Sequence, residues 1–373
     1  MKKLICFLVA AVLLTGAACA ETVGNGLGFE VLRALSDGTE NQVISPLSLA
    51  VGLAMAAQGA EGETRQEILD ALGLSYPEEA PFILESMAET GMRYANAVFL
   101  TGEMIPRKAY VSDLEQLFGA KWFDPEHSGP ASINKWVEDV TDGMIPEIIR
   151  ELPEEVQLVL LNAIAMDAKW QIPFDPNLTV KEPFFTPDGE ILAEMMHSTL
   201  YADYGEADSA QLLRLGYRDS SLSMLIALPE EGAMNSVLNG LCESGLDYFV
   251  FREEKVKVEL SMPKTDIAAT NNLAEPLQTL GIEAVFSDHA DLSGISEEMP
   301  LKVDSVLQKA RLILDEEGTR AAAVTALGVE TCAMPLPEEI VEFKLNRPFA
   351  VVVADEVSGA VCFAGIVANP IGN

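Results

Sequence analysis

The residues of this sequence that could act in catalysis or metal binding are three histidines and a small number of cysteines. His127, His197 and His289 have no cysteine or acidic partners at the spacing of metal-ligand motifs. The sequence also contains no nucleophile elbow, HExxH motif or phosphate-binding loop. Cys332 could act as a nucleophile only beside a positioned histidine, which the sequence does not indicate. The sequence therefore predicts a protein that is not an enzyme and that uses no metal ion or cofactor.

The most unusual stretch runs from Asp315 to Pro337 and reads DEEGTRAAAVTALGVETCAMPLP. Alternate residues from Thr319 to Thr331 form one uncharged face, while Arg320 and Glu330 fall on the other. That alternation suits a strand with one buried face, but the many Ala and Gly residues would add little packing to an ordinary strand. Two interpretations stay open. The stretch is a flexible exposed loop, or it is a loop that can become a strand because its small side chains fit between existing strands.

Composition describes a globular and strongly acidic chain. It has 373 residues, 49% of them hydrophobic, and a formal net charge of −34. That charge argues against nucleic acid and anionic membrane surfaces as partners. Because no internal repeat or linker divides the chain, we expect a single domain over residues 21–373.

The first twenty residues have the features of an export signal: two lysines, an apolar run and then small residues. Ala18-Cys19-Ala20 allows cleavage before Glu21, which gives a signal peptide over residues 1–20. The residues up to Cys19 also resemble a loose bacterial lipoprotein box, which would end the signal at residue 18 and place a lipid on Cys19. Both alternatives predict an exported protein, either secreted or held at the cell surface, and a lipid on Cys19 would be its only contact with a membrane.

The cysteines beyond this signal are Cys242, Cys332 and Cys362. Three cysteines, an odd number spread over a long chain, do not make a disulfide framework. Cys362 lies in the apolar run AVCFAGIV and is expected to be a small buried hydrophobe, whereas Cys332 is interpreted as an exposed thiol.

Helix signals dominate the first third of the chain. Ser45 and Pro46 suit the start of a helix, and the residues that follow, LSLAVGLAMAAQGA, are apolar on nearly every side. Such a helix is expected to be buried. Further helices are expected over residues 27–35, 63–72, 111–118, 133–144, 237–246 and 273–280.

Strand signals dominate the remainder. The segment from Gln157 to Trp170 is too apolar for a sheet edge and predicts a central strand. Leu301 to Leu314 predicts one long strand, or a strand pair, leading into the stretch at Asp315. Other strands are expected over residues 42–44, 94–100, 183–185, 194–201, 210–217, 223–228 and 256–262, with a terminal hairpin of residues 349–355 and 360–368. Helices followed by strands make this an α+β fold.

Seven segments, in this order, resemble the serpin family over essentially the whole chain beyond the signal. They are ISPLSLAVGLAMAAQGA (44–60), NKWVEDVTDGMI (134–145), LNAIAMDAKWQIPFD (161–175), SMPK (261–264), LDEEGTRAAAVT (314–325), and NRPFAVVV with FAGIVANP near the end. The resemblance implies a serpin fold with three β-sheets, about eight or nine helices and an exposed reactive-centre loop over about residues 316–340.

The resemblance also implies suicide inhibition of a protease. In serpins, the protease cleaves the loop and becomes acylated, and the freed loop then inserts as a new central strand of the largest sheet. The expected partner is therefore a target protease held in a covalent acyl complex, with a monomeric inhibitor.

Residues of this chain match the family's hinge, from which the loop would insert. The matching residues are Glu316, Glu317, Gly318 and Thr319, followed by the small residues Ala321, Ala322 and Ala323. Arg320 departs from the family's usual acidic residue. Lys264 and Glu316 match a pair that forms an ion pair at the top of the sheet in relatives.

A second set matches the polar cluster that is called the shutter in this family. Ser45, Ser48 and Asn162 match it, and Gln308 stands where the family has a histidine. Glutamine can donate and accept a hydrogen bond as neutral histidine does, so the cluster is expected to persist without a titratable group.

The family's spacing, counted from Glu316, places the reactive bond between Cys332 and Ala333, with Met334 as the alternative anchor. A small residue before the bond predicts elastase-like or subtilisin-like serine proteases as targets, with papain-like cysteine proteases as an alternative. A non-inhibitory serpin that acts as a binding protein also stays open, although the small residues of the hinge favour inhibition.

Overall fold

The computed structural model describes residues 23–86, 91–100, 105–123, 129–151, 157–207, 209–296, 300–319 and 339–372. The predicted reactive bond at Cys332–Ala333, the hinge residues Ala321 to Ala323, His127 and the export signal with Cys19 lie outside the described residues.

The described residues contain eight α-helices and sixteen strands. The helices are α2 (Asn25–Leu35), α3 (Pro46–Gly59), α4 (Gly62–Leu72), α5 (Glu79–Ser86), α6 (Lys108–Leu117), α7 (Pro130–Val140), α8 (Met234–Ser244) and α9 (Ala274–Thr279). The strands are β1 (Gln42–Ile44), β2 (Met92–Leu100), β3 (Lys121–Phe123), β4 (Leu158–Met166), β5 (Ala168–Lys169), β6 (Val180–Thr186), β7 (Gly189–Ala207), β8 (Ala210–Gly216), β9 (Leu222–Pro229), β10 (Val256–Pro263), β11 (Thr265–Asn272), β12 (Ser305–Leu314), β13 (Gly318–Thr319), β14 (Ile340–Lys344), β15 (Phe349–Asp355) and β16 (Val361–Val367). Helices followed by strands confirm the α+β prediction.

A five-stranded sheet has the order β11-β12-β4-β2-β3. Strand β4 lies at its centre and every one of its residues is buried, so the prediction of a central strand is confirmed. It pairs antiparallel with β2 and parallel with β12, while β12 pairs antiparallel with β11. The boundary between β4 and β12, called the seam below, is therefore a parallel pair flanked by antiparallel ones.

The remaining long strands form a nine-stranded sheet with the order β1-β16-β15-β9-β8-β7-β10-β14 and with β6 also paired to β7. Its longest strand, β7, pairs with β6 and β10 through residues 189–202 and with β8 through residues 203–207. It thus joins two sheets, one of β6, β7, β10 and β14 and another that continues to β1. Together with the five-stranded sheet, these make three large sheets, and β5 and β13 form a separate two-stranded pair.

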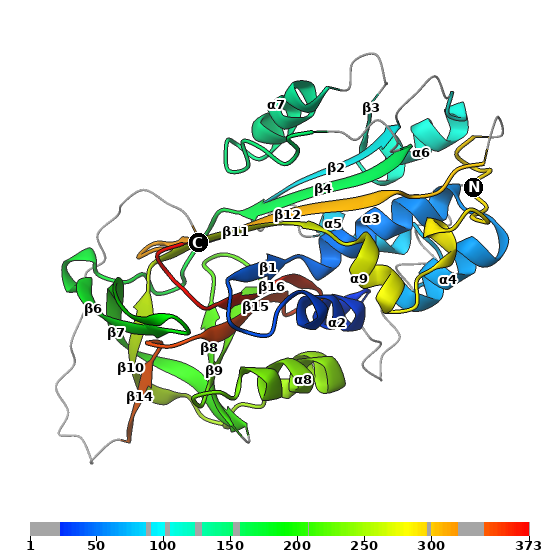
Figure 1. The fold of residues 1–373 in the computed structure, drawn as a ribbon. Coiled ribbons are helices and arrows are strands. Elements are labelled where there is room, and N and C mark those ends of the chain that lie inside the picture. The colour runs from blue at the N-terminus through cyan, green and yellow to red at the C-terminus, as the bar shows by residue number, and fades with distance from the viewer. Residues whose placement is uncertain are drawn as a thin grey trace.

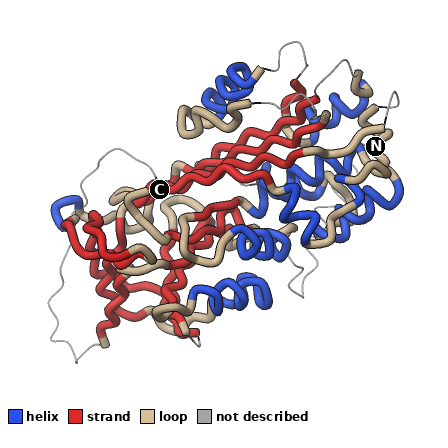
Figure 2. Tube along the Cα trace, in the orientation of Figure 1, coloured by secondary structure: helices blue, strands red, loops and turns tan. Residues whose placement is uncertain are grey.

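Helices cover the two faces of the five-stranded sheet differently. Figure 1 shows α7 and the segment that follows it on one face, while α3 and the strands β1 and β16 lie against the other. The same view in Figure 2 separates the helical end of the molecule from its strand-rich end. Nearly all residues of α3 are buried, as its apolar sequence predicted. No helix in the described ranges has the length and apolar character needed to cross a membrane.

Several elements differ from the sequence predictions. Helix α5 and strands β3 and β14 were not predicted, and β12 begins at Ser305 rather than at Leu301. Helix α7 ends at Val140, where Thr141 closes it, and so stops four residues short of the predicted end at Met144. Strand β11, over residues 265–272, was not predicted at all.

Candidate functional site: a hinge beside a sheet seam

The segment after β12 turns back sharply over residues 315–318. The Asp315 side chain accepts hydrogen bonds from the backbone N–H groups of Glu317 and Gly318, at 2.9 and 3.1 Å. The Asp315 N–H donates to the Gly318 carbonyl at 2.9 Å. A short aspartate that bonds its own backbone two residues on is a turn former, so this residue reverses the chain direction.

After the turn, Gly318 and Thr319 form β13, which pairs antiparallel with Ala168 and Lys169 of β5. Strand β5 follows β4 after a single residue, Asp167. The chain after β12 therefore starts back alongside the end of β4, antiparallel to it.

The turn is fixed to the segment after β5. The Trp170 N–H donates to the Glu317 carbonyl at 2.8 Å, and the Phe174 N–H donates to the Glu316 carbonyl at 2.8 Å. The Trp170 indole N–H donates to the Asp315 carbonyl at 2.9 Å. Trp170 is itself held by Tyr217, whose ring stacks on it with centroids 4.8 Å apart. A buried aromatic cluster thus positions the hinge.

Gly318 is required by the close approach of two backbones. A Cβ atom at this position would lie 2.1 Å from the Ala168 carbonyl oxygen and 2.6 Å from the Lys169 Cα. Neither neighbour is a flexible side chain, so only glycine fits without displacing the pair of strands.

Glu316 lies at the centre of a small polar cluster. Lys264 Nζ is 2.8 Å from one carboxylate oxygen, and the Thr179 hydroxyl donates to the other at 2.8 Å. The side chain of Glu316 is 12% exposed and that of Lys264 is 35% exposed. The structure therefore brings together the two residues that the resemblance paired.

These contacts shift the protonation of both groups. Burial acts to raise the pKa of Glu316, but hydrogen bonds from Lys264, the backbone and Thr179 together outweigh it, so the pKa is lowered. The hydrogen bond to Glu316 raises the pKa of Lys264 against the opposing effect of burial. Both groups are therefore charged at neutral pH.

Gln308 of β12 holds the start of α3. Its amide oxygen accepts the Ser45 backbone N–H at 2.9 Å, and its amide nitrogen donates to the Ser45 carbonyl at 3.0 Å. The Ser45 hydroxyl oxygen accepts the Ser48 N–H at 3.1 Å, which caps the helix. Ser45 is thus both an ordinary helix cap and a partner of the sheet above it.

Asn162 of β4 is held by a different set of contacts. It accepts a hydrogen bond from the Ser48 hydroxyl and donates one to the Asn96 side chain on β2. Across the seam it meets Gln308 through one long contact of 3.4 Å. All four residues are buried, and Asn162 and Gln308 are directly opposite each other in the sheet.

The polar row is longer than the sequence indicated. Asn96, Asn162, Gln308 and Asn271 lie at one register position across β2, β4, β12 and β11. Asn271 accepts a hydrogen bond from Gln42 of β1 at 3.2 Å. In the sequence, the sign that points to Asn96 is a polar residue inside the mostly apolar strand predicted over residues 94–100. Trp170 and Phe174 are buried core residues that also hold the hinge through hydrogen bonds.

The remaining candidates lie elsewhere. Cys362 is fully buried, as predicted, and burial raises the pKa of its thiol. His197 contacts the Ser261 hydroxyl at 3.0 Å and Glu182 at 3.5 Å. Throughout the part of the chain that the structure describes, no three His, Cys, Asp or Glu side chains are arranged to hold a metal ion.

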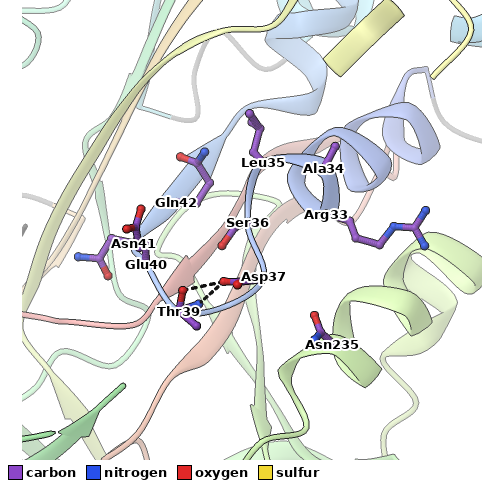
Figure 3. Close-up of a pocket in the computed structure, with 10 residues that line it drawn as sticks. All are labelled: Arg33, Ala34, Leu35, Ser36, Asp37, Thr39, Glu40, Asn41, Gln42 and Asn235. Carbon is purple, nitrogen blue, oxygen red and sulfur yellow. Dashed lines mark hydrogen bonds between the residues drawn. The ribbon is translucent and has the colours of Figure 1, made fainter. Parts of the chain in front are cut away.

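A hollow of about 500 Å³ lies between the end of α2, the loop before β1 and the start of α8 (Figure 3). Its lining is mostly polar, and Asp37 and Thr39 bond each other within it. Figure 3 shows side chains that point in different directions rather than toward one centre. It thus differs from the usual ligand pocket, which has apolar walls and convergent polar groups.

The fold and this hinge define a class of α+β protein built on a central sheet with a parallel seam. A family model described as Serpin (serine protease inhibitor) matches residues 23–370. The chain belongs to the serpin family, and its fold is the serpin fold.

Relatives and solved structures agree with this assignment. An uncharacterised serpin-like protein of Thermococcus kodakarensis is 32% identical over 371 residues, which covers 93% of this chain and 84% of that protein. Alpha-1-antiproteinase S of Cavia porcellus is 32% identical over 351 residues, which cover 89% of this chain and 85% of that protein. The thermophilic serpin tengpin in its native state is 27% identical with a TM-score of 0.83, covering 95% of this chain and 96% of that one. Human thyroxine-binding globulin complexed with thyroxine is 25% identical with a TM-score of 0.83, covering 94% and 98%.

Proposed function

We propose that this protein is a suicide-type inhibitor of serine proteases of the elastase-like or subtilisin-like class. It acts by cleavage of the loop over about residues 316–340 and insertion of that loop between β4 and β12. The scissile bond is proposed between Cys332 and Ala333, and the product is a covalent acyl complex with the protease.

The single observation that carries the proposal is the geometry of the seam and the hinge. Strands β4 and β12 are parallel, so an entering strand has the same orientation to both, and a chain that doubles back after β12 would be antiparallel to both. The hinge already runs in that direction, because β13 is antiparallel to β5. One parallel pair would become two antiparallel pairs, which are slightly more stable per residue.

The polar row is consistent with opening at the seam. Gln308 makes its two better hydrogen bonds to Ser45, and Asn162 bonds to Ser48 and Asn96. The side-chain link between the two strands within this row is the 3.4 Å contact of Gln308 with Asn162. Within this row, separation of the strands would therefore cost one weak side-chain contact besides the backbone ladder.

A binding protein without inhibitory activity is the alternative. The similarity to human thyroxine-binding globulin keeps this possibility in view, whereas the similarity to an alpha-1-antiproteinase favours inhibition. The mostly polar lining of the hollow in Figure 3 gives the binding alternative little support.

The test is incubation of the protein with elastase, subtilisin, papain and trypsin, followed by denaturing electrophoresis. The proposal expects a complex with elastase or subtilisin that survives boiling in SDS, and none with trypsin, because residues 321–338 contain no Lys or Arg. The same protease inactivated at its catalytic serine is the control and should give no such band. Cleavage of the loop without any stable complex would favour the binding protein, and a complex with papain alone would change the target class.

We also propose that the protein is exported and acts as a monomer. The basic and apolar first twenty residues support export. The mass of the N-terminal peptide of the mature protein tests this: a start at Glu21 indicates secretion, and a lipid-modified Cys19 indicates a surface lipoprotein. An uncleaved Met1 would contradict export.

A further inference from the structure

A second cavity, of about 520 Å³, lies beside the middle of β7. Strand β7 pairs with β10 up to Ala202 and with β8 from Asp203 onward. Residues of β7 between Ser198 and Asp203 line one side of the cavity, and the segment after β5, the end of β8 and the turn before β9 line the other. The cavity therefore lies at the junction of the two parts of the nine-stranded sheet.

The body of this cavity is apolar. Five buried or partly buried hydrophobic side chains line it, and they are Leu200, Leu215, Leu222, Leu260 and Phe174. Trp170 and Tyr217, whose rings stack on each other, also belong to the lining. Small-molecule sites typically have volumes of about 300–1,000 Å³ and mostly apolar walls with a few polar groups. In size and in walls, this cavity resembles such a site more closely than the hollow of Figure 3 does.

Charged side chains that contact one another form part of the lining. Arg214 is directly opposite Asp203 in the sheet, and its guanidinium contacts that carboxylate at 3.0 and 3.1 Å. Glu356 accepts a hydrogen bond from the Ser223 hydroxyl and lies 3.4 Å from Arg214. The Arg214 guanidinium also lies over the Phe251 ring, 5.2 Å from its centroid. Arg214 is therefore held in a fixed position, and both carboxylates already have partners.

Lys255 is the member of this charged group that keeps unused hydrogen-bond donors. Its Nζ lies 3.7 Å from Asp203, and this is its one ion pair among the described residues. That distance is too long for a hydrogen bond, and an ammonium group offers three donors. The Lys255 side chain is 58% exposed, so an incoming group can reach it. An anion beside the cavity could accept these donors and would also be close to Arg214.

We propose that this cavity binds a small amphipathic anion, an apolar body that carries a carboxylate or sulfonate group at one end. The apolar body lies against the leucines and Trp170, and the anionic group pairs with Lys255 beside Arg214. The proposal is independent of the proposed function, because no residue that lines the cavity belongs to the loop over about residues 316–340. Since the Trp170 indole N–H bonds the Asp315 carbonyl, the ligand would contact a side chain that positions the hinge.

The test uses two fluorescent probes that share one ring system. Anilinonaphthalene sulfonate carries an anionic group, and phenylnaphthylamine lacks it, while both become brighter in apolar surroundings. Titration of the full chain should show saturable binding of the sulfonate at one site per chain. Ser198→Phe places a ring inside the cavity and should weaken binding of both probes on the order of tenfold. Thr199→Phe is the matched control and should bind both probes like the wild type, because neighbouring residues of a strand point to opposite faces and Thr199 is exposed.

A second variant tests the anionic part of the proposal. Lys255→Met keeps the apolar stem and removes the donors, so it should weaken binding of the sulfonate by about threefold to fivefold and leave the neutral probe unchanged. Lys181→Met is its control, because Lys181 is exposed on β6 and does not line the cavity. Since Lys255 is itself exposed, its variant should fold even if Ser198→Phe does not.

Three results would overturn the proposal. Binding of both probes by folded Ser198→Phe at the wild-type level would show that the probes bind elsewhere. Equal effects of Lys255→Met on the two probes, or no effect on the sulfonate, would exclude an anionic ligand at this position. Failure of the wild type to bind the sulfonate at a single saturable site would exclude the cavity as a binding site.

Discussion

Glu316 connects the hinge to the junction of two sheets. Its partner Lys264 is the one residue between β10, which ends at Pro263, and β11, which begins at Thr265. The pair therefore joins the start of the loop to the point where the nine-stranded sheet passes into the five-stranded sheet. A partly exposed pair of this kind contributes about 1 kcal/mol or less to stability, so its main effect is expected on the position of the hinge.

This pair predicts a pH dependence that Glu316→Gln should remove. The folded pKa of Glu316 lies below its ordinary value of 4.5, so its contribution is complete above pH 4.5 and is lost as the pH falls through the folded pKa. The difference in free energy of unfolding between wild type and Glu316→Gln should be about 1 kcal/mol at pH 7 and shrink below pH 4.5. Urea unfolding at several pH values measures it, with Glu317→Gln as the control. A difference that stays constant with pH would contradict the assignment.

Gly318 offers a test of the backbone contact at the hinge. Gly318→Ala places a Cβ against the Ala168 carbonyl, 2.1 Å away, and should destabilise the native protein by about 1–3 kcal/mol. Gly52→Ala is the control, because nothing lies within 4 Å of its Cβ position in α3. That variant should be neutral or slightly stabilised. Equal unfolding midpoints for the two variants would show that the hinge tolerates a side chain.

The reactive bond is a prediction about two residues outside the described ranges. Cleavage by an inhibited protease should release a C-terminal peptide that begins at Ala333, since Cys332 suits a shallow apolar pocket. The intact mass of that peptide decides the position. A peptide that begins after Met334 would move the register by two residues, and any other start would contradict the spacing of the family.

At the scale of elements, strands with strong patterns were predictable and weakly patterned ones were not. The run LVLLNAIAM is apolar except for Asn162, and this indicated a strand buried on both faces, as β4 is. Strand β11 reads TDIAATNN, and its Asp, Asn and Ala residues are poor strand formers. It is a strand because β12 pairs with it along its whole length, which is tertiary context that the sequence does not display.

The residues of the candidate site also divide into those that the sequence could identify and those that it could not. Ser45, Ser48, Asn162, Gln308, Lys264 and Glu316 could be named from the family resemblance, and the structure brings them together in two clusters. Asn96 and Trp170 could not, because their roles depend on the register of β2 and on backbone hydrogen bonds of the hinge. A hydrogen bond to a backbone group does not depend on the type of the residue that supplies that group, so the sequence does not reveal it.

The substitution Thr319→Arg tests whether the loop inserts into the sheet as a strand. By the alternation of the sequence, Thr319→Arg places a charge on the face that would be buried after insertion, at a cost of several kcal/mol if it stays unpaired. The variant should be cleaved at the same bond but should release active protease. Arg320→Glu, on the opposite face, is the control and should inhibit like the wild type. Inhibition by Thr319→Arg at the wild-type level would argue against insertion from this position.

At the scale of the whole molecule, the closed sheet is expected to be a kinetically trapped state. An inserted loop would gain backbone hydrogen bonds on both sides of the new strand. Each contributes about 0.5–1.5 kcal/mol net, so roughly a dozen would give on the order of 10 kcal/mol before the cost of ordering the loop. Separation of β4 from β12 would then be the barrier that retards a transition that is favourable overall.

The unfolding temperature of the protein before and after cleavage within the loop tests this central claim most directly. Limited proteolysis by a non-target enzyme yields the cleaved form, and calorimetry compares it with the intact protein under the same conditions. Insertion at the seam predicts an increase on the order of tens of degrees, because each kcal/mol of added stability moves the midpoint by a few degrees. An unchanged or lower unfolding temperature after complete cleavage would contradict insertion and leave a binding protein with an ordinary exposed loop.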